Sequence, residues 1–529
     1  MISKNYAGYL IRFLFVGTIA LLYSCNSRND FKKNQTHQNI SDKNIARGKI
    51  LAATYCQNCH QLPDPSLLDS KHWEEGVLPA MGPRLGIFYF TGFKEYPSSR
   101  RDRNVDQNYY PSTPLLSFDD WQCILDYYTA LSPDTLPAQQ RQYAVKKNDE
   151  LFKIETPETG VNSAATCLVK IDTLKTPHQL LVADALSRNL YRFNKQLSIL
   201  DSVNMKSPIV DIEIRPDEML ACGIGIMNPN NGKFGTASFI HTGTTGRMVA
   251  DTIHLFNSLA RPVQLCTSDF NGDGKPDYLV CEFGHLAGAL SWMENTGDGK
   301  KFTRHILRNI PGAIKAYVQD VNKDGLPDIW ALFSQGDEGI FLFTNKGHGK
   351  FEQEQVLRFP PINGSSYFEL ADFNKDGFPD ILYTCGDNAD LSSVLKPYHG
   401  VYIYMNDGSN HFKQQYFFPM HGCYKAMARD FDGDGDLDIA AISFFADYAN
   451  HPEESFIYLE NKGNLDLHPY SIAGTSSGRW LTMDAADIDG DGKVDIVLGN
   501  FSIAPAFIQG AANWKQGPPF MVLKNIIKK

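Results

Sequence analysis

Several signatures of catalysis and of nucleic-acid binding are missing from this chain. Its 529 residues contain no Gly-rich nucleotide motif, no nucleophile elbow and no histidine pair of the zincin type. The net charge of −10 argues against a nucleic acid as the partner. No catalytic residue is therefore assigned, and an electron-transfer or binding function is favoured over an enzymatic one.

Long hydrophobic runs are also scarce, and a short one lies near the N-terminus. Lys4 and Arg12 form a positive segment, residues 13–23 are mostly apolar, and Cys25 follows. The apolar run is too short for a comfortable membrane span. The pattern resembles a bacterial lipoprotein signal with Cys25 as the acylated residue, and an uncleaved helical anchor is the alternative. Either anchor predicts an extracytoplasmic protein held at a bacterial membrane, on the periplasmic or the cell-surface side.

Only one Cys-x-x-Cys pair occurs, at Cys56 and Cys59, and His60 follows it. A zinc ribbon requires a second pair, and a thioredoxin-like motif follows a strand, whereas the residues before Cys56 have helical spacing. Two thiols one helical turn apart can bind both vinyl groups of one porphyrin, and the next residue places an imidazole beneath the iron. The motif predicts one covalent haem c on Cys56 and Cys59, with His60 as an axial ligand.

Two predicted helices flank this motif. Residues 44–55 lead into it, with Gly48 eight residues before the first cysteine, and residues 118–131 carry one apolar face with Ser117 or Asp119 as cap. The order of helix, haem motif, loop, ligand and helix resembles the class I cytochromes c. The resemblance implies that Gly48 lets the two helices cross closely.

The sixth iron ligand is predicted from the small number of candidate side chains. Met81 is the only methionine after His60 in this predicted domain, and a thioether there would raise the redox potential. His72 is the alternative ligand, with a lower potential, and an open site is the third possibility. The carbonyl of Pro63 or Pro65 is expected to orient the His60 ring.

The remaining seven cysteines show no metal spacing. They are predicted to be small buried hydrophobic residues. A disulfide between Cys266 and Cys281, across neighbouring strands, is the alternative for two of them.

A nine-residue pattern, Asp-x-[Asp/Asn]-x-Asp-Gly-x-x-Asp, occurs five times, with starts 51, 52, 58 and 57 residues apart. Oxygens at positions 1, 3, 5 and 9 and the carbonyl of position 7 suit Ca²⁺, and glycine at position 6 permits the sharp turn. About five bound calcium ions are therefore predicted. The predicted side-chain ligands are Asp269, Asn271, Asp273, Asp277, Asp320, Asn322, Asp324, Asp328, Asp372, Asn374, Asp376, Asp380, Asp430, Asp432, Asp434, Asp438, Asp487, Asp489, Asp491 and Asp495.

These loops are not EF-hands, because an EF-hand loop ends in a bidentate glutamate at position 12. That position holds Val280, Ala331, Tyr383, Ala441 and Leu498. Each loop instead runs into β-type residues, and four strands in a unit of about 50 residues predict a propeller blade. The units resemble FG-GAP/VCBS repeats, whose propellers are similar to the integrin α-chain head.

Two further blades without the loop are predicted at residues 165–204 and 209–252, which brings the number to seven. Residues 151–155 are expected to supply the outer strand of the last blade, next to a third strand at residues 521–525. The resemblance implies that the calcium hairpins lie on one face and the loops between second and third strands on the other.

Those second-to-third-strand loops are predicted to carry the binding function, since loops on a rigid scaffold usually do. Mixed aromatic and polar side chains there suit a glycan or a protein partner. His285, His399, Tyr448, His451 and Trp514 could converge on that face.

The sequence thus predicts a multidomain protein, with a small all-α cytochrome c domain before an all-β propeller. The predicted segments are a signal (1–25), a flexible tether (26–43), the cytochrome domain (44–132), a linker (133–160) and the propeller (161–529). The predicted function is electron transfer through haem c to or from a redox partner protein. A propeller-based sugar or alcohol dehydrogenase, and an adhesion module with an accessory haem, are the alternatives.

Overall fold

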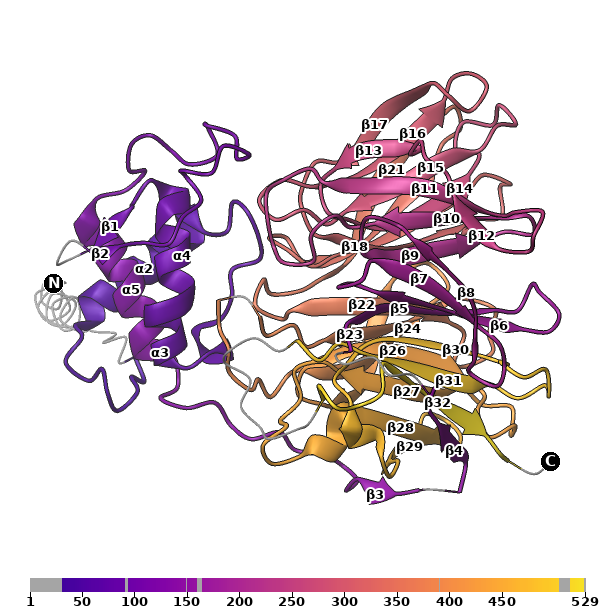
Figure 1. Cartoon of the computed structure of the whole chain (residues 1–529). Coiled ribbons are helices and arrows are strands. Elements are labelled where there is room, and N and C mark those ends of the chain that lie inside the picture. The colour runs from indigo at the N-terminus through magenta and orange to yellow at the C-terminus, as the bar shows by residue number, and fades with distance from the viewer. Residues whose placement is uncertain are drawn as a thin grey trace, which may run out of the picture.

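The computed structural model describes residues 31–90, 94–148, 150–158, 164–389, 391–503 and 514–527. A small helical region, residues 31–132, precedes a β-propeller (Figure 1). Cys25 and its predicted signal lie outside the described residues. Among the described helices, none has both the length and the apolar character needed to span a membrane.

The helical region is built around two longer helices. Its elements are α2 (Asp42–Tyr55), η1 (Pro65–Leu67), α3 (Ser70–His72), η2 (Trp73–Val77), α4 (Leu78–Met81), η3 (Gly82–Leu85), β1 (Tyr89–Phe90), β2 (Lys94–Glu95) and α5 (Phe118–Leu131). The Ser41 hydroxyl caps α2 by accepting from Asn44 N at 3.2 Å, and the Ser117 hydroxyl caps α5 by accepting from Asp120 N at 3.1 Å. The bounds of α5 confirm the predicted helix, and Ser117 rather than Asp119 is its cap.

Helices α2 and α5 cross at Gly48, as predicted. A Cβ atom at this position would lie 1.8 Å from the carbonyl oxygen of Cys123, so no larger residue fits without moving a helix. Around the crossing, the Trp73 and Trp121 side chains are fully buried. Close backbone approach therefore gives this small region a packed core.

The segment before α2 folds back onto α5. Asn34 N donates to Ala130 O at 2.9 Å, and the Asn34 amide donates to Thr129 O and Ser132 O. Thr36 Oγ1 donates to the Asp134 carboxylate at 2.6 Å. Residues 34–41 are therefore held by the helical region.

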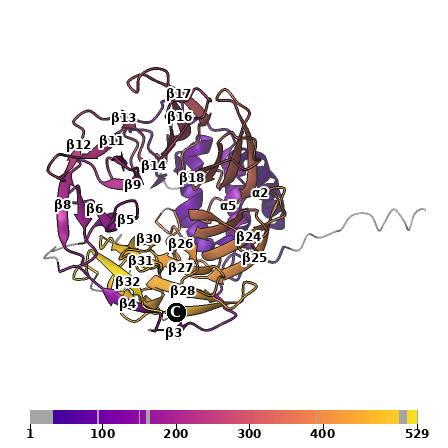
Figure 2. The ribbon, with the colours of Figure 1, turned by 90° about the vertical axis from the view of Figure 1, so that its right-hand side faces the viewer.

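In the described residues, seven blades surround the propeller axis (Figure 2), five with four strands and two extended by a fifth, which confirms the predicted seven-bladed fold. In chain order the first six blades are β5 (Thr166–Asp172), β6 (Gln179–Asp184), β7 (Asn189–Phe193), β8 (Ile199–Asn204); β9 (Ile209–Ile214), β10 (Glu218–Gly223), β11 (Gly235–Thr242), β12 (Met248–Ala250), with β13 (Phe256–Leu259) beside β11; β14 (Pro262–Ser268), β15 (Asp277–Glu282), β16 (Ala289–Asn295), β17 (Phe302–Arg308); β18 (Ala313–Gln319), β19 (Asp328–Phe333), β20 (Gly339–Asn345), β21 (Phe351–Arg358); β22 (Ser365–Ala371), β23 (Asp380–Cys385), β24 (Gly400–Asn406), β25 (Phe412–Pro419); and β26 (Cys423–Arg429), β27 (Asp438–Ser443), β28 (Phe456–Asn461), β29 (Leu467–Ser471). Short 3₁₀ turns η4 (Pro452–Ser455) and η5 (Thr475–Ser477) flank β28 and β29.

The seventh blade closes the ring with a strand from the other end of the propeller chain. It contains β30 (Trp480–Ala486), β31 (Asp495–Asn500), β32 (Phe520–Asn525) and β4 (Phe152–Glu155), and β4 pairs antiparallel with β32. This confirms the predicted outer strand from residues 151–155. On the inner side, the Asp484 carboxylate accepts from Ile171 N at 2.8 Å and joins the seventh blade to the first.

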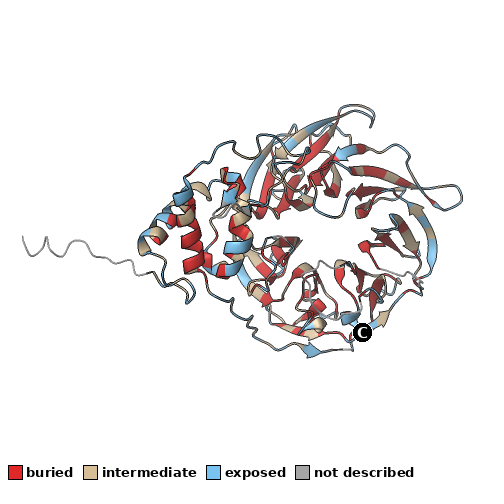
Figure 3. Cartoon of the chain, turned by 60° about the vertical axis from the view of Figure 1, so that its left-hand side comes forward, coloured by how far each residue is buried: buried red, intermediate tan, exposed pale blue. Residues whose placement is uncertain are grey.

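Buried residues concentrate on the inner strands of the blades and on the facing sides of the helices (Figure 3). In the five blades with Asp-rich motifs, every residue of the second strand is buried. Neighbouring blades pack against both faces of these second strands. Their sequences are therefore continuous apolar runs rather than alternations of apolar and polar residues.

Residues 139–147, predicted as linker, lie along the propeller. The Arg141 guanidinium pairs with the Glu454 carboxylate and donates to Pro419 O at 2.9 Å. Beyond it, β3 (Lys146–Lys147) adds to β29 in parallel.

The helical region packs on the propeller face that carries the second-to-third-strand loops (Figures 1 and 2). The Tyr398 hydroxyl donates to Leu67 O at 3.1 Å, and the Asn231 amide donates to the Asp102 carboxylate at 2.9 Å. The Asp-rich motifs join the first strand to the second in their blades, so they lie at the opposite end of the second strand from the second-to-third-strand loops. The two sets of loops therefore lie on opposite faces, as predicted.

All nine described cysteines are free. Cys266 stands opposite Leu279, and Cys281 stands opposite Gln264, so the alternative disulfide between these two cysteines is absent. Most of the others are buried, in agreement with their predicted role as small hydrophobic residues.

We predict that Gly48→Ala destabilises the helical region, although alanine in a helix is normally more favourable than glycine by about 1 kcal/mol. The added methyl group meets the α5 backbone, and such overpacking costs about 1–3 kcal/mol. Thermal unfolding followed by far-UV circular dichroism measures the loss. Ala53→Gly, on the exposed side of α2, is the control and should show only the loss of helix propensity; a stabilising Gly48→Ala would contradict the crossing.

Candidate functional site

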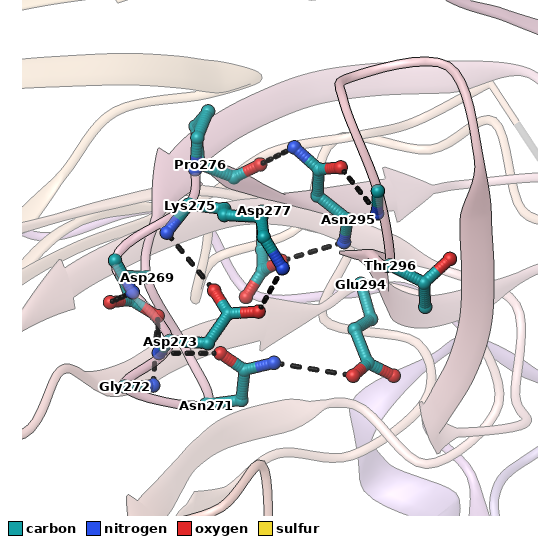
Figure 4. Close-up of polar contacts among 12 residues, drawn as sticks. Asp269, Asn271, Gly272, Asp273, Lys275, Pro276, Asp277, Glu294, Asn295 and Thr296 are labelled. Carbon is teal, nitrogen blue, oxygen red and sulfur yellow. Dashed lines mark hydrogen bonds and ion pairs between the residues drawn. The ribbon is translucent and has the colours of Figure 1, made fainter.

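The first carboxylate of each Asp-rich motif folds its own loop, and Figure 4 shows the loop of Asp269. Asp269 accepts hydrogen bonds from Gly272 N at 2.8 Å, Asp273 N at 3.1 Å and Gly274 N at 2.8 Å. The residue at position 1 of the other four loops likewise accepts from the N–H of position 6. The chain is thereby wrapped around the place where the predicted ligands converge.

Glycine is required at position 6 because of the backbone conformation there, not because a side chain would clash with neighbouring atoms. Its φ angle is between 80° and 96° in all five loops, and a Cβ atom there would meet nothing within 4 Å. Position 4 is also left-handed in every loop, even where it is Lys323 or Lys375. The prediction of a sharp turn is confirmed, and the second left-handed position is a feature that the sequence pattern did not reveal.

The aspartate at position 9 is the first residue of the second strand and is essentially completely buried. One oxygen of Asp277 accepts from Phe270 N at 3.0 Å, and the other accepts from Asn295 N at 2.8 Å. Asp328, Asp380, Asp438 and Asp495 make the same two bonds in their blades. This carboxylate therefore joins the loop, the second strand and the end of the third strand.

Burial makes the charge on these carboxylates costly. Desolvation raises the pKa of Asp438 to about 7 and that of Asp495 to about 6, against the opposing effect of their hydrogen bonds. The pKa values of Asp277, Asp328 and Asp380 are raised for the same reason. A bound cation would favour the charged form.

The donor set fits a hard cation. Carboxylate oxygens of Asp430, Asp432 and Asp438 lie within 4.8 Å of one another, and those of Asp487, Asp489 and Asp495 do the same. The three earlier loops have asparagine at position 3, so an amide oxygen replaces one carboxylate there. All-oxygen donors in a tight loop are the ligands that Ca²⁺ prefers.

An asparagine at the end of the third strand completes each unit, and its role was missed from the sequence. The Asn295 side-chain oxygen accepts from Gly297 N and Gly299 N, which shapes the third-to-fourth-strand hairpin. The Asn345 amide donates to Phe270 O at 3.0 Å, and the Asn525 amide donates to Phe431 O at 2.6 Å, both across to a neighbouring calcium loop. The Asn-x-Gly that follows the third strand in four of the five units was the available signal.

The Cys-x-x-Cys-His motif lies at the end of α2. Cys56 N donates to Ala52 O at 2.9 Å as the last helical bond, and Cys59 N donates to Cys56 O in the following turn. His60 Nδ1 is 2.8 Å from Gln61 O; since a carbonyl only accepts, Nδ1 carries the proton. This leaves the His60 Nε2 nitrogen for a metal, so the residues fit a haem iron.

The prediction that the carbonyl of Pro63 or Pro65 orients the His60 ring was wrong. The Pro63 carbonyl accepts from the Tyr128 hydroxyl at 3.2 Å, and the Pro65 carbonyl accepts from Trp73 Nε1 at 2.8 Å. Both therefore support the helical core, and the neighbouring Gln61 carbonyl orients the imidazole instead.

Met81 and His72, the two predicted sixth ligands, differ in their surroundings. Met81 ends α4 and packs against the same core as Cys56. The His72 Nδ1 atom lies 2.8 Å from the Asp69 carboxylate, which also caps the short helix α3. His72 thus has a structural partner, and Met81 as the sixth ligand stays a prediction.

The five loop residues expected to converge do so only in part. The rings of Tyr448 and Trp514 meet at 4.4 Å, and both are buried. His399 is buried separately, and burial lowers its pKa well below the usual range. His451 pairs with Glu453. Burial lowers the pKa of His285, and Asp102 of the helical region opposes this effect.

Comparison with known proteins identifies the repeats. Residues 269–331, 320–383 and 430–498 match the FG-GAP-like repeat, and these segments include all five Asp-rich loops. The chain therefore carries FG-GAP-like repeats in a seven-bladed propeller, a scaffold that supports a binding or adhesion module.

Two curated relatives match over part of the chain. Integrin alpha-4 of Xenopus laevis is 26% identical over 214 residues, 36% of this chain and 19% of the relative. A T-cell immunomodulatory protein homolog of Plasmodium falciparum is 25% identical over 167 residues, 28% of this chain and 22% of the relative. The chain thus matches about a fifth of the length of each.

Among solved structures, the N-terminal domain of Nup159 matches with a TM-score of 0.41 and 10% identity, covering 73% of this chain and 99% of that one. BBS1N in complex with ARL6DN matches with a TM-score of 0.43 and 12% identity, covering 72% and 97%. Likenesses this weak carry no argument about function.

We predict that Asp434→Asn and Asp438→Asn separate ion binding from folding in one loop. Asp434 is exposed, so its substitution should weaken calcium binding and leave the metal-free protein equally stable. Asp438→Asn replaces an oxygen acceptor facing a buried N–H, which should also cost the metal-free protein about 1–3 kcal/mol. Calorimetric calcium titration and thermal unfolding in chelator measure the two effects. If the two variants unfold with equal free energy in the absence of metal, the structural role of the aspartate at position 9 would be contradicted.

Proposed function

We propose that this protein is a membrane-anchored, extracytoplasmic monohaem c-type cytochrome with a calcium-binding propeller that docks a redox partner protein or a glycan. The observation that carries the proposal is the geometry of His60. Its Nδ1 proton is fixed on the Gln61 carbonyl, and His60 directly follows two free cysteines, Cys56 and Cys59, at the end of α2.

The side chains of this region have distinct roles in the proposal. Haem c supplies one-electron transfer when bound. Cys56 and Cys59 would hold it covalently, and His60 and Met81 would supply a nitrogen and a sulfur to its iron. The Gln61 carbonyl raises the basicity of the His60 ring. The tight α2–α5 crossing keeps this set of ligands on a rigid frame.

The calcium loops serve the propeller in this proposal. A Ca²⁺ ion in each Asp-rich loop compensates the buried charge of the position 9 aspartate, which otherwise depends on two backbone N–H groups. The ions therefore stabilise the blades from the face away from the helical region. The remaining exposed loops are the surface offered to a partner.

The anchor and the location rest on the sequence. Acylation of Cys25 would hold the chain on a bacterial membrane, and covalent haem c is assembled outside the cytoplasm. Of the predicted tether, Phe31 packs against the helical core, Lys33 pairs with Asp42, and Asn34 donates to the end of α5.

An adhesion module with an accessory haem is the second candidate, favoured by the match of the repeats to integrin alpha-4. The two candidates differ in whether the haem cycles between oxidation states. Reversible reduction and oxidation of the purified protein supports the cytochrome. A haem that does not titrate, with glycan or protein binding intact, supports adhesion.

We predict that protein produced with the haem-maturation machinery shows the absorption spectrum of one low-spin c-type haem per chain. Met81→Ala should change the oxidised spectrum and lower the midpoint potential, because a thioether ligand raises it. His72→Ala is the matched control and should leave the spectrum unchanged, since His72 is held by Asp69. An unchanged spectrum for Met81→Ala would rule out the methionine ligand.

A further inference from the structure

Two of the Asp-rich loops, residues 269–277 and 487–495, form a natural matched pair. Their positions 1, 4, 5, 6, 7 and 9 hold the same residues. Position 3 is the one predicted side-chain ligand that differs, and it is Asn271 in the first loop and Asp489 in the second. The two loops therefore differ chiefly at position 3 and in the side chains that reach it.

The lysine at position 7 has the same partner in both loops. Lys275 pairs with Asp273 at 2.8 Å, and Lys493 pairs with Asp491 at 3.1 Å. Both partners are the aspartate of position 5. These lysines therefore reduce the negative charge of the two loops to the same extent and do not make them different.

A side chain of the third strand reaches position 3 in both blades. It precedes the asparagine that ends the strand, and it is Glu294 in β16 and Lys524 in β32. Glu294 Oε1 accepts from the Asn271 amide at 3.2 Å (Figure 4), whereas the Lys524 ammonium group pairs with the Asp489 carboxylate. The same strand position thus brings a negative charge to one loop and a positive charge to the other.

The contact of Lys524 with Asp489 involves a predicted calcium ligand. Carboxylate oxygens of Asp487, Asp489 and Asp495 lie within 4.8 Å of one another, in the group that fits a cation. The Lys524 and Asp489 side chains are 31% and 14% exposed, so water and salt screen their attraction only in part. The positive charge of Lys524 is therefore already placed at a carboxylate that a metal ion would need.

Glu294 has the opposite charge and fixes the side chain of Asn271. Its Oε2 atom is 2.6 Å from His305 Nε2, so the carboxylate is held beside the loop. Its Oε1 atom takes the Asn271 amide hydrogen, and the Asn271 oxygen accepts from Asp273 N at 3.0 Å within the loop. Glu294 therefore adds negative charge and orients a predicted oxygen ligand.

The two other loops with asparagine at position 3 use its amide differently. Asn322 Nδ2 donates to the Asp324 carboxylate at 2.9 Å, and Asn374 Nδ2 donates to the Asp376 carboxylate at 2.8 Å. The third-strand position is not acidic in these two blades. There the amide uses an oxygen of a predicted calcium ligand, which Glu294 spares in the first loop.

We infer that the third-strand side chain before the terminal asparagine tunes the calcium affinity of the loop that it reaches. Lys524 competes with Ca²⁺ for Asp489 and weakens the site of the seventh blade, whereas Glu294 strengthens the site of the third blade. The inference rests on the calcium sites of the proposed function. It implies that the loops fill at different concentrations of free calcium, so that the propeller responds to calcium in steps.

Hydrogen-exchange mass spectrometry of the full-length protein at buffered free calcium tests this inference, because each loop is measured in its own peptide. Lys524→Met removes the ammonium group and keeps a long side chain. It should lower the free calcium concentration that half-protects residues 487–495 by about tenfold, and residues 320–328 should not change. Glu294→Met should raise the midpoint of residues 269–277 by a similar factor.

Lys153→Met is the matched control in the same blade. Lys153 lies opposite Lys524 on the neighbouring strand β4 and pairs with Glu155 at 2.8 Å. Its substitution removes the same charge without touching a loop ligand, so the midpoint of residues 487–495 should stay unchanged. Lys524→Arg keeps the charge and should retain the original midpoint.

The outcomes separate this inference from the calcium sites themselves. An unchanged midpoint in Lys524→Met or in Glu294→Met, or an equal shift in Lys153→Met, would overturn the inference while leaving the calcium sites in place. If calcium protects none of the five loops, the proposed calcium sites and this inference would be overturned together.

Discussion

Each calcium-motif blade depends on one buried carboxylate, the aspartate at position 9 of the repeat. Its two oxygens bind the backbone of the loop behind it and the end of the third strand, as in Asp277 with Phe270 and Asn295. Burial of a charge is costly unless it is hydrogen-bonded or paired, and here both oxygens accept backbone hydrogen bonds. The Asp-rich motif therefore has a role in folding its blade, and the ion proposed for it would further compensate the buried charge.

This arrangement divides the propeller into two faces with different tasks. The Asp-rich loops and the Asn-shaped hairpins occupy one face, and the helical region is seated on the other through contacts such as Tyr398 with Leu67. The face that was expected to be free for a partner is thus partly occupied by the chain itself. The surface left for an external partner is therefore smaller than the sequence suggested.

Much of this architecture was predictable because it is written in local or periodic patterns. The repeat period predicted the blades, and the strand pattern at residues 151–155 predicted how the last blade is completed. Gly48 predicted where the two helices cross. Three contacts could not be predicted. The Gln61 carbonyl orients His60 although neighbouring carbonyls were equally possible. The hydrogen bond of Arg141 to the propeller and that of Asn345 to the neighbouring blade depend on distances between segments far apart in sequence.

Native mass spectrometry of the intact, mature protein tests the central claim most directly, because it counts covalent and bound groups on one chain. The account predicts a polypeptide carrying one haem and about five calcium ions, one for each Asp-rich loop. A mass equal to that of the polypeptide alone, in a folded protein prepared with haem-maturation machinery and calcium, would contradict it.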